Sequence, residues 1–123
     1  EAIILYELIV NDRFPEPEEC GITHVQYAYA LSDVIGELNR FILRLIRLEK
    51  MEETNRLFEY MNEIYSYLFS LDYPDALIPG LRRKIDVNRG TITRMEGTLT
   101  TSSSMIKLSK LLENSHKNTE ESK

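Results

Sequence analysis

The chain has 123 residues, of which 42% are hydrophobic and 28% charged, and its formal net charge at pH 7 is −5. This length allows one domain with a single core, and charges interrupt every apolar run before it could span a membrane. The acidic balance excludes indiscriminate binding to polyanions. The single cysteine, Cys20, allows no internal disulfide and fits a reducing cytoplasm, where we expect the protein to reside.

The chain begins inside a helical pattern. Residue 1 is a glutamate, and no Ser, Thr, Asp or Asn stands before the apolar positions of residues 1–10 to cap a helix. We therefore expect a fragment whose preceding helices are absent. The first helix is predicted to end at Asn11-Asp12, before a proline-containing loop with the sequence RFPEPEECGI.

A long second helix is predicted from Thr23, a favourable N-cap, to about Lys50. Its apolar residues recur at the three- and four-residue spacing of a buried helix face. They are Tyr27, Leu31, Val34, Ile35, Leu38, Ile42 and Leu45.

Two further helices follow with the same kind of spacing. The third, capped by Thr54 or Asn55, has a packing face of Leu57, Met61, Ile64, Leu68 and Leu71. The fourth begins after Pro79-Gly80 and has a packing face of Leu81, Ile85, Ile92, Met95 and Leu99. We expect an all-α, antiparallel helical domain over residues 1–112 and a disordered polar tail over residues 113–123.

A stripe of charge runs along the second helix. Asp33, Glu37, Arg40, Arg44 and Arg47 are spaced four, three, four and three residues apart, which places them on one narrow arc. Two carboxylates one turn apart are able to ligate a divalent cation such as Mg²⁺. The alternative is that Glu37 pairs with Arg40 while Asp33 faces water, as on many solvated helix surfaces.

The arginines of this stripe also allow two interpretations. Arg40, Arg44 and Arg47 could follow a phosphate backbone, or they could be a solvated helix end, where basic residues are favoured by the helix dipole.

A denser basic patch opens the fourth helix. Arg82 and Arg89 can pair with Asp86 within the helix, which leaves Arg83 and Lys84 unpaired near a helix N-terminus that favours anions. Arg83 and Lys84 are therefore candidate phosphate contacts.

Three blocks of the chain together resemble the translin superfamily. Glu1-Ala2 looks like the end of its Glu-x-x-Glu-Ala motif, and VQYAYALSDVIGELNR is similar to its V-D-Y-L-x-G-x-x-D-x-x-G-E-L-x-R helix. DYPDALIPGLRRKIDVNRGTITRMEGTLT resembles the C-terminal segment of the archaeal relatives. Within the superfamily the blocks are most similar to the branch of translin-associated factor X (TRAX).

The resemblance implies an all-helical subunit of a hollow homo- or hetero-oligomer, the latter with a translin-like subunit, that encloses single-stranded RNA or DNA. In the TRAX branch it implies a Mg²⁺-dependent endoribonuclease. Glu1 matches the second glutamate of Glu-x-x-Glu, and Asp33, Gly36 and Glu37 match the D-x-x-G-E motif. The implied metal ligands and catalytic residues are therefore Glu1, Asp33 and Glu37, with Arg40, Arg44, Arg83 and Lys84 as the expected nucleic-acid contacts.

The chain also departs from the family pattern. The first glutamate of Glu-x-x-Glu would precede residue 1, and Gln26 replaces an aspartate of the family helix. A non-catalytic, translin-type scaffold that binds nucleic acid is therefore the alternative function, and the 123-residue chain could lack cleavage activity even where the whole protein has it.

Overall fold

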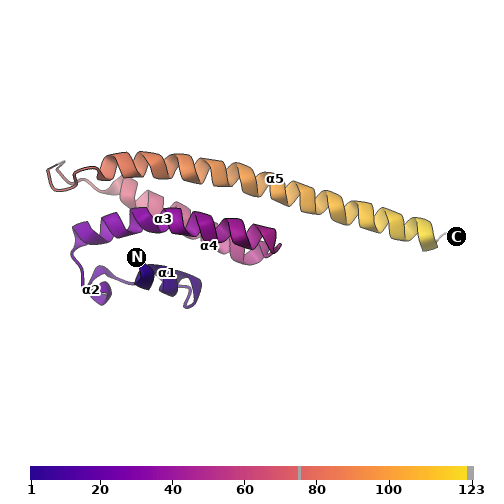
Figure 1. Cartoon of the computed structure of the whole chain (residues 1–123), viewed down its shortest axis with the longest axis horizontal. Coiled ribbons are helices and arrows are strands. Elements are labelled where there is room, and N and C mark those ends of the chain that lie inside the picture. The colour runs from indigo at the N-terminus through magenta and orange to yellow at the C-terminus, as the bar shows by residue number, and fades with distance from the viewer. Residues whose placement is uncertain (75, 122–123) are drawn as a thin grey trace. The chain divides into compact units, whose positions relative to one another are not determined.

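A computed structural model describes residues 1–74 and 76–121 and shows helices joined by loops (Figure 1). The helices are α1 (Ala2–Ile9), α2 (Pro17–Cys20), α3 (His24–Arg47), α4 (Met51–Ser70) and α5 (Leu81–Glu121). No strand occurs in these residues, which confirms the all-α prediction. The chain divides into two compact units, Glu1–Thr93 and the part from Arg94 onward.

The start of α3 is held by a capping box. The Thr23 hydroxyl oxygen accepts from the backbone N–H of Gln26 at 3.1 Å, and the Gln26 side-chain oxygen accepts from the backbone N–H of Thr23 at 2.9 Å. Thr23 is thus the N-cap that the sequence predicts, and Gln26 has a structural use at the position where the family has an aspartate. The helix ends at Arg47, three residues before the predicted limit.

The α3–α4 pair forms the core of the first unit. The two helices run antiparallel side by side (Figure 1). All the predicted apolar positions of α3 are buried, as are Leu57, Met61, Ile64 and Leu68 of α4, whereas Leu71 is partly exposed. The packing faces predicted from helical spacing are confirmed, because burial follows the same period of 3.6 residues.

The start of α4 differs from the prediction. The helix begins at Met51, so neither Thr54 nor Asn55 caps it. Thr54 is fully buried one turn inside the helix, where its hydroxyl oxygen has no hydrogen-bond partner among the described residues. The glutamates at positions 52 and 53 lie in the first turn, where the helix dipole favours negative charge, and no side-chain cap forms.

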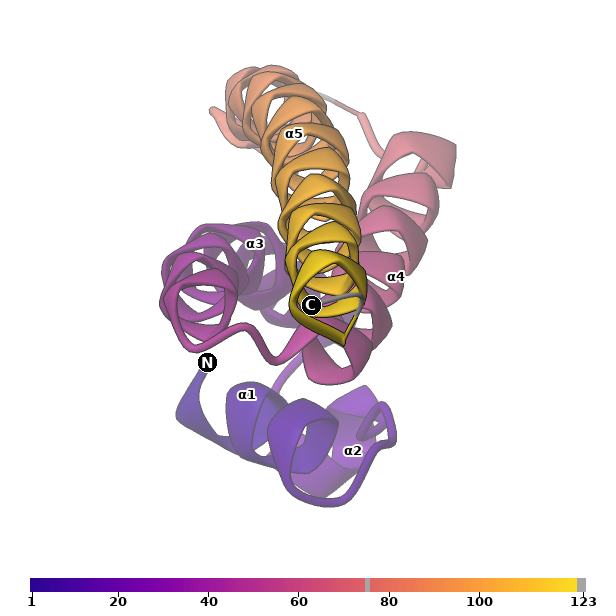
Figure 2. The same cartoon turned by 90° about the vertical axis from the view of Figure 1, so that its right-hand side faces the viewer.

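Helix α1 lies against both α3 and α4 (Figure 2). Its residues Ile4 and Leu8 are buried. At its C-terminal end, the Arg56 guanidinium of α4 donates to the carbonyl oxygens of Leu8 at 2.8 Å and Ile9 at 3.2 Å. These carbonyls have no partner inside the helix, so Arg56 satisfies them and holds α1 against α4.

Within the first unit, α5 starts after Gly80, whose φ of 78° lies in the left-handed region that glycine adopts without strain. The inward positions Leu81, Ile85 and Ile92 are buried, as predicted. Met95 and Leu99, further along α5, are buried as well. The line of buried residues also includes Asn88, which the apolar pattern did not reveal.

The second unit is the remainder of α5. The helix continues to Glu121 through the predicted tail, since no proline follows Pro79 and no glycine follows Gly97. Every residue from 107 to 120 is exposed, so this part forms no core of its own. The sequence predicts that the helical domain ends at residue 112, and α5 continues past this residue without interruption. The disorder predicted for residues 113–123 stays a prediction. None of the described helices is long and apolar enough to cross a membrane.

Candidate functional site

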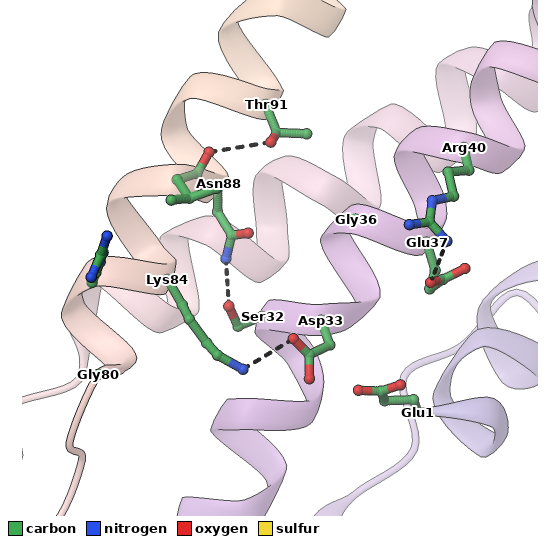
Figure 3. Close-up of a pocket in the computed structure, with 12 residues that line it drawn as sticks. Glu1, Ser32, Asp33, Gly36, Glu37, Arg40, Gly80, Lys84, Asn88 and Thr91 are labelled. Atoms are coloured by element: carbon green, nitrogen blue, oxygen red, sulfur yellow. Dashed lines mark hydrogen bonds and ion pairs between the residues drawn. The ribbon is translucent and has the colours of Figure 1, made fainter.

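A groove of about 580 Å³ lies between α3 and the first turns of α5 (Figure 3). It brings together every predicted site residue except Arg44. Its lining consists of Glu1, Ser32, Asp33, Gly36, Glu37, Arg40, Gly80, Arg83, Lys84, Val87, Asn88 and Thr91. Residues from three distant parts of the sequence thus form one site in the first unit.

Two carboxyl groups face each other in this groove. Glu1 directly precedes α1, and the packing of α1 on α3 brings its carboxyl group to Asp33 (Figure 3). The hydrogen bond shared with Asp33 and burial raise the pKa of Glu1. Burial acts to raise the pKa of Asp33 as well, but hydrogen bonds from Glu1 and Lys84 outweigh it and lower that pKa. As the pH rises, Asp33 therefore loses its proton before Glu1 does.

Cations of the same chain balance the acidic residues. The ammonium nitrogen of Lys84 lies 3.2 Å from Oδ1 of Asp33 and 5.6 Å from the centre of the Tyr29 ring. The Arg40 guanidinium donates to Glu37 at 3.2 Å, which is the i, i+3 pair that the sequence left open. The prediction that Lys84 is unpaired is wrong, because the first turns of α5 lie beside α3 and place Lys84 next to Asp33.

The donor set fits a divalent cation only in part. No three Asp, Glu, His or Cys side chains of the described chain come close enough together to hold one ion. Glu1 and Asp33 do approach each other, and Mg²⁺ commonly takes one or two carboxylates and completes its octahedron with water or phosphate oxygens. The Glu1–Asp33 pair thus matches the number of carboxylates that Mg²⁺ commonly takes, and its role as a metal site stays a prediction. Glu37 is engaged by Arg40, and its role as a third ligand stays a prediction as well.

The floor of the groove contains residues that sequence reasoning missed. The side-chain amide of Asn88 donates to the Ser32 hydroxyl at 2.8 Å, and both residues are buried. Asn88 falls three residues after Ile85 and four before Ile92, on the face of the helix that the apolar residues define. A polar residue at such a position indicates a buried hydrogen bond, and this pattern could have identified Asn88. A Cβ atom added to Gly36 would meet no atom within 4 Å, so packing does not require a glycine there.

The remaining predicted phosphate contacts divide between groove and outer surface. Arg83 is exposed at the groove. Arg44 and Arg47 are exposed in the last turn of α3, where the helix dipole favours positive charge, and neither lines the groove. The groove therefore brings Arg40, Arg83 and Lys84 together, whereas Arg44 lies outside it on the solvated end of the helix. Phosphate binding at these residues stays a prediction.

The model of the translin family matches residues 3–103. The chain belongs to the translin family. It is 33% identical over 109 residues to the uncharacterized protein MJ0175 of Methanocaldococcus jannaschii, a match that covers 88% of this chain and 49% of that protein. The family resemblance expected from the three sequence blocks is confirmed.

Solved structures of AfC3PO share the translin-family fold. A complex of AfC3PO with duplex RNA superposes with a TM-score of 0.77 at 28% identity, and a crystal structure of AfC3PO superposes with a TM-score of 0.74 at 27% identity. Each match covers 85% of this chain and 55% of the AfC3PO chain. The chain thus spans about half the length of the proteins that it matches.

Proposed function

We propose that this chain is part of a TRAX-like translin-family subunit that binds nucleic acid and cleaves RNA with the help of Mg²⁺. One observation carries the proposal: the carboxylates of Glu1 and Asp33 share a groove with the basic side chains of Arg40, Arg83 and Lys84. A metal-dependent nuclease uses both a cation site and basic groups that position the phosphates of its substrate.

Each group in the groove has a role in this proposal. Lys84, Arg83 and Arg40 bind phosphate oxygens, Arg40 through the planar fork that suits bidentate contacts. Glu1 and Asp33 hold Mg²⁺, and Glu37, one helical turn from Asp33, is available once Arg40 moves. The bound ion supplies Lewis acidity at a phosphate and lowers the pKa of a water molecule.

The substrate and assembly are part of the same proposal. The family resemblance implies single-stranded RNA or DNA, whereas the similar AfC3PO was solved with duplex RNA. Both single- and double-stranded substrates therefore belong in the test. We propose a homo-oligomer, or a hetero-oligomer with a translin-like subunit, acting in the cytoplasm.

The decisive experiment uses the protein that contains this chain. Asp33→Asn combined with Glu37→Gln is expected to slow Mg²⁺-dependent RNA cleavage about 100-fold or more, because metal sites are sensitive even to changes in residues that only support the ligands. Glu59→Gln, an exposed carboxylate of α4 outside the groove, is the matched control. Cleavage is measured on labelled RNA with Mg²⁺ and with EDTA, and an unchanged rate in the double variant would refute the assignment.

The ion pairs of the groove favour a second candidate, a scaffold that binds nucleic acid without cleaving it. Asp33 and Glu37 are each paired with an internal cation, as in a purely structural groove. The scaffold predicts salt-sensitive oligonucleotide binding with no dependence on Mg²⁺ and intact RNA after long incubation. The EDTA comparison separates the two functions.

A further inference from the structure

We propose that Lys84 and Arg40 couple metal binding to phosphate binding in this groove. Without nucleic acid they occupy the carboxylates of Asp33 and Glu37. A phosphate that draws the two cations to itself frees these carboxylates for a divalent cation. The inference rests on the proposed function, since it concerns how the same groove is regulated.

Lys84 is placed to act in this way. Its ammonium nitrogen is 3.2 Å from Oδ1 of Asp33 and lies over the ring of Tyr29, whose hydroxyl in turn donates to the carbonyl oxygen of Pro79 at 2.5 Å. The side chains of Lys84 and Asp33 are 45% and 44% exposed, so a ligand can reach both. The flexible four-carbon stem of lysine lets the ammonium group move to a phosphate without any change in α5.

Arg40 holds the second carboxylate. It donates to Glu37 at 3.2 Å, and its side chain is 79% exposed. The contact uses one of the guanidinium nitrogens, Nη1. A phosphate offers the guanidinium a bidentate contact, which is stronger than this single hydrogen bond.

The groove thus contains two carboxylates that are engaged by internal cations, Asp33 and Glu37, and a third acidic residue, Glu1. A divalent ion that enters this arrangement has to displace Lys84 from Asp33, and it meets the repulsion of the ammonium group. When a phosphate draws the Lys84 ammonium group away from Asp33, the affinity of the groove for the divalent ion increases. By thermodynamic linkage the metal then increases the affinity for the phosphate by the same factor.

The test measures Mn²⁺ affinity of the complete protein by calorimetry, with and without a saturating single-stranded deoxyoligonucleotide. The oligonucleotide alone is titrated as the background, and electrophoresis checks that it stays intact. In the wild type we expect the oligonucleotide to tighten Mn²⁺ binding about tenfold, within the range of ordinary coupling between sites. The reciprocal titration is expected to give the same factor.

Variants separate this coupling from direct attraction between the metal and the phosphate. In the absence of oligonucleotide, Lys84→Gln is expected to bind Mn²⁺ more tightly than the wild type does. The coupling factor, which is the ratio of the Mn²⁺ affinities with and without oligonucleotide, is expected to fall toward one in this variant. Arg40→Gln is expected to show a smaller change in the same direction. Lys50→Gln removes the same charge at an exposed position outside the groove and is expected to keep the tenfold factor.

The outcomes are distinguishable from those of the proposed function. A wild-type factor of one, or an unchanged factor in both Lys84→Gln and Arg40→Gln, overturns the coupling even if RNA is cleaved. Coupled binding in a protein that leaves RNA intact supports the coupling and overturns the nuclease. Absence of Mn²⁺ binding in every variant overturns both.

Discussion

The groove and a second charged cluster in the first unit both combine carboxylates with basic side chains, but their carboxylates have different partners. The second cluster, here called the Arg56 cluster, consists of Asp12, Arg56 and Tyr60. Oδ1 of Asp12 accepts from Arg56 at 3.0 Å and from the Tyr60 hydroxyl at 2.5 Å. The hydrogen bond from Tyr60, followed by the one from Arg56, lowers the pKa of Asp12. All partners of this carboxylate are donors, so the cluster stabilises the fold and leaves no charge for a ligand.

The groove instead sets a carboxyl group against a carboxyl group. Glu1 and Asp33 shift each other's pKa in opposite directions, and the internal cations that balance the groove lie on exposed, flexible side chains. Like charges brought together at an accessible surface are typical of binding sites rather than of structural clusters. In the Arg56 cluster the carboxylate has two donors as partners, whereas in the groove Asp33 and Glu37 each have a cation and Glu1 lies against Asp33.

The largest expected effect on stability comes from Arg56→Ala. The change removes hydrogen bonds to two carbonyl oxygens at the end of α1 and to Asp12, so we expect the free energy of unfolding to fall by about 2–3 kcal/mol. Urea denaturation measures it. Arg40→Ala is the matched control, because an exposed pair contributes less than about 1 kcal/mol. Equal losses in the two variants would contradict the distinction between the clusters.

A smaller effect is expected on the floor of the groove, where Asn88 and Ser32 are 6% and 4% exposed. Either Asn88→Ala or Ser32→Ala leaves a buried polar partner unsatisfied, so we expect each to reduce stability by about 1–2 kcal/mol. The double variant should lose less than the sum of the two, since the second change removes the orphaned group. Additive losses in a double-mutant cycle would show that the two side chains act independently.

The smallest effects concern pH, and their signs differ between Asp12 of the Arg56 cluster and Glu1 of the groove. The folded-state pKa of Asp12 is lowered, so its contribution to stability is present above the ordinary pKa of 3.8 and is lost as the pH falls through the lowered value. The pKa of Glu1 is raised, so its contribution is present below 4.5 and is lost as the pH rises through the raised value.

Denaturation at a series of pH values between 2 and 7 in metal-free buffer checks these signs. Asp12→Asn is expected to flatten the acid side of the stability profile, whereas Glu1→Gln is expected to flatten the part above pH 4.5. If both variants changed the pH dependence of the free energy of unfolding in the same direction, the opposite pKa shifts of Asp12 and Glu1 would be contradicted.

Sequence patterns were enough to predict most of the helices and their buried faces. The period of 3.6 residues is a local property, so Leu38 on α3 and Met61 on α4 could be assigned to the core without knowing what covers them. Thr23 was identifiable as a cap for the same reason. The start of α4 was missed because no side-chain cap marks it and Lys50 occupies the N-cap position.

Which charged side chains meet depends on how the helices pack, and sequence patterns do not reveal it. The stripe of α3 placed Asp33 and Glu37 on one face, and the family resemblance added Glu1, but the partner of Asp33 is Lys84, which lies 51 positions further along the chain. No local pattern encodes that contact, because it depends on how α5 packs across α3. The packing likewise separated Arg40, which lines the groove, from Arg44, one turn further along the same helix.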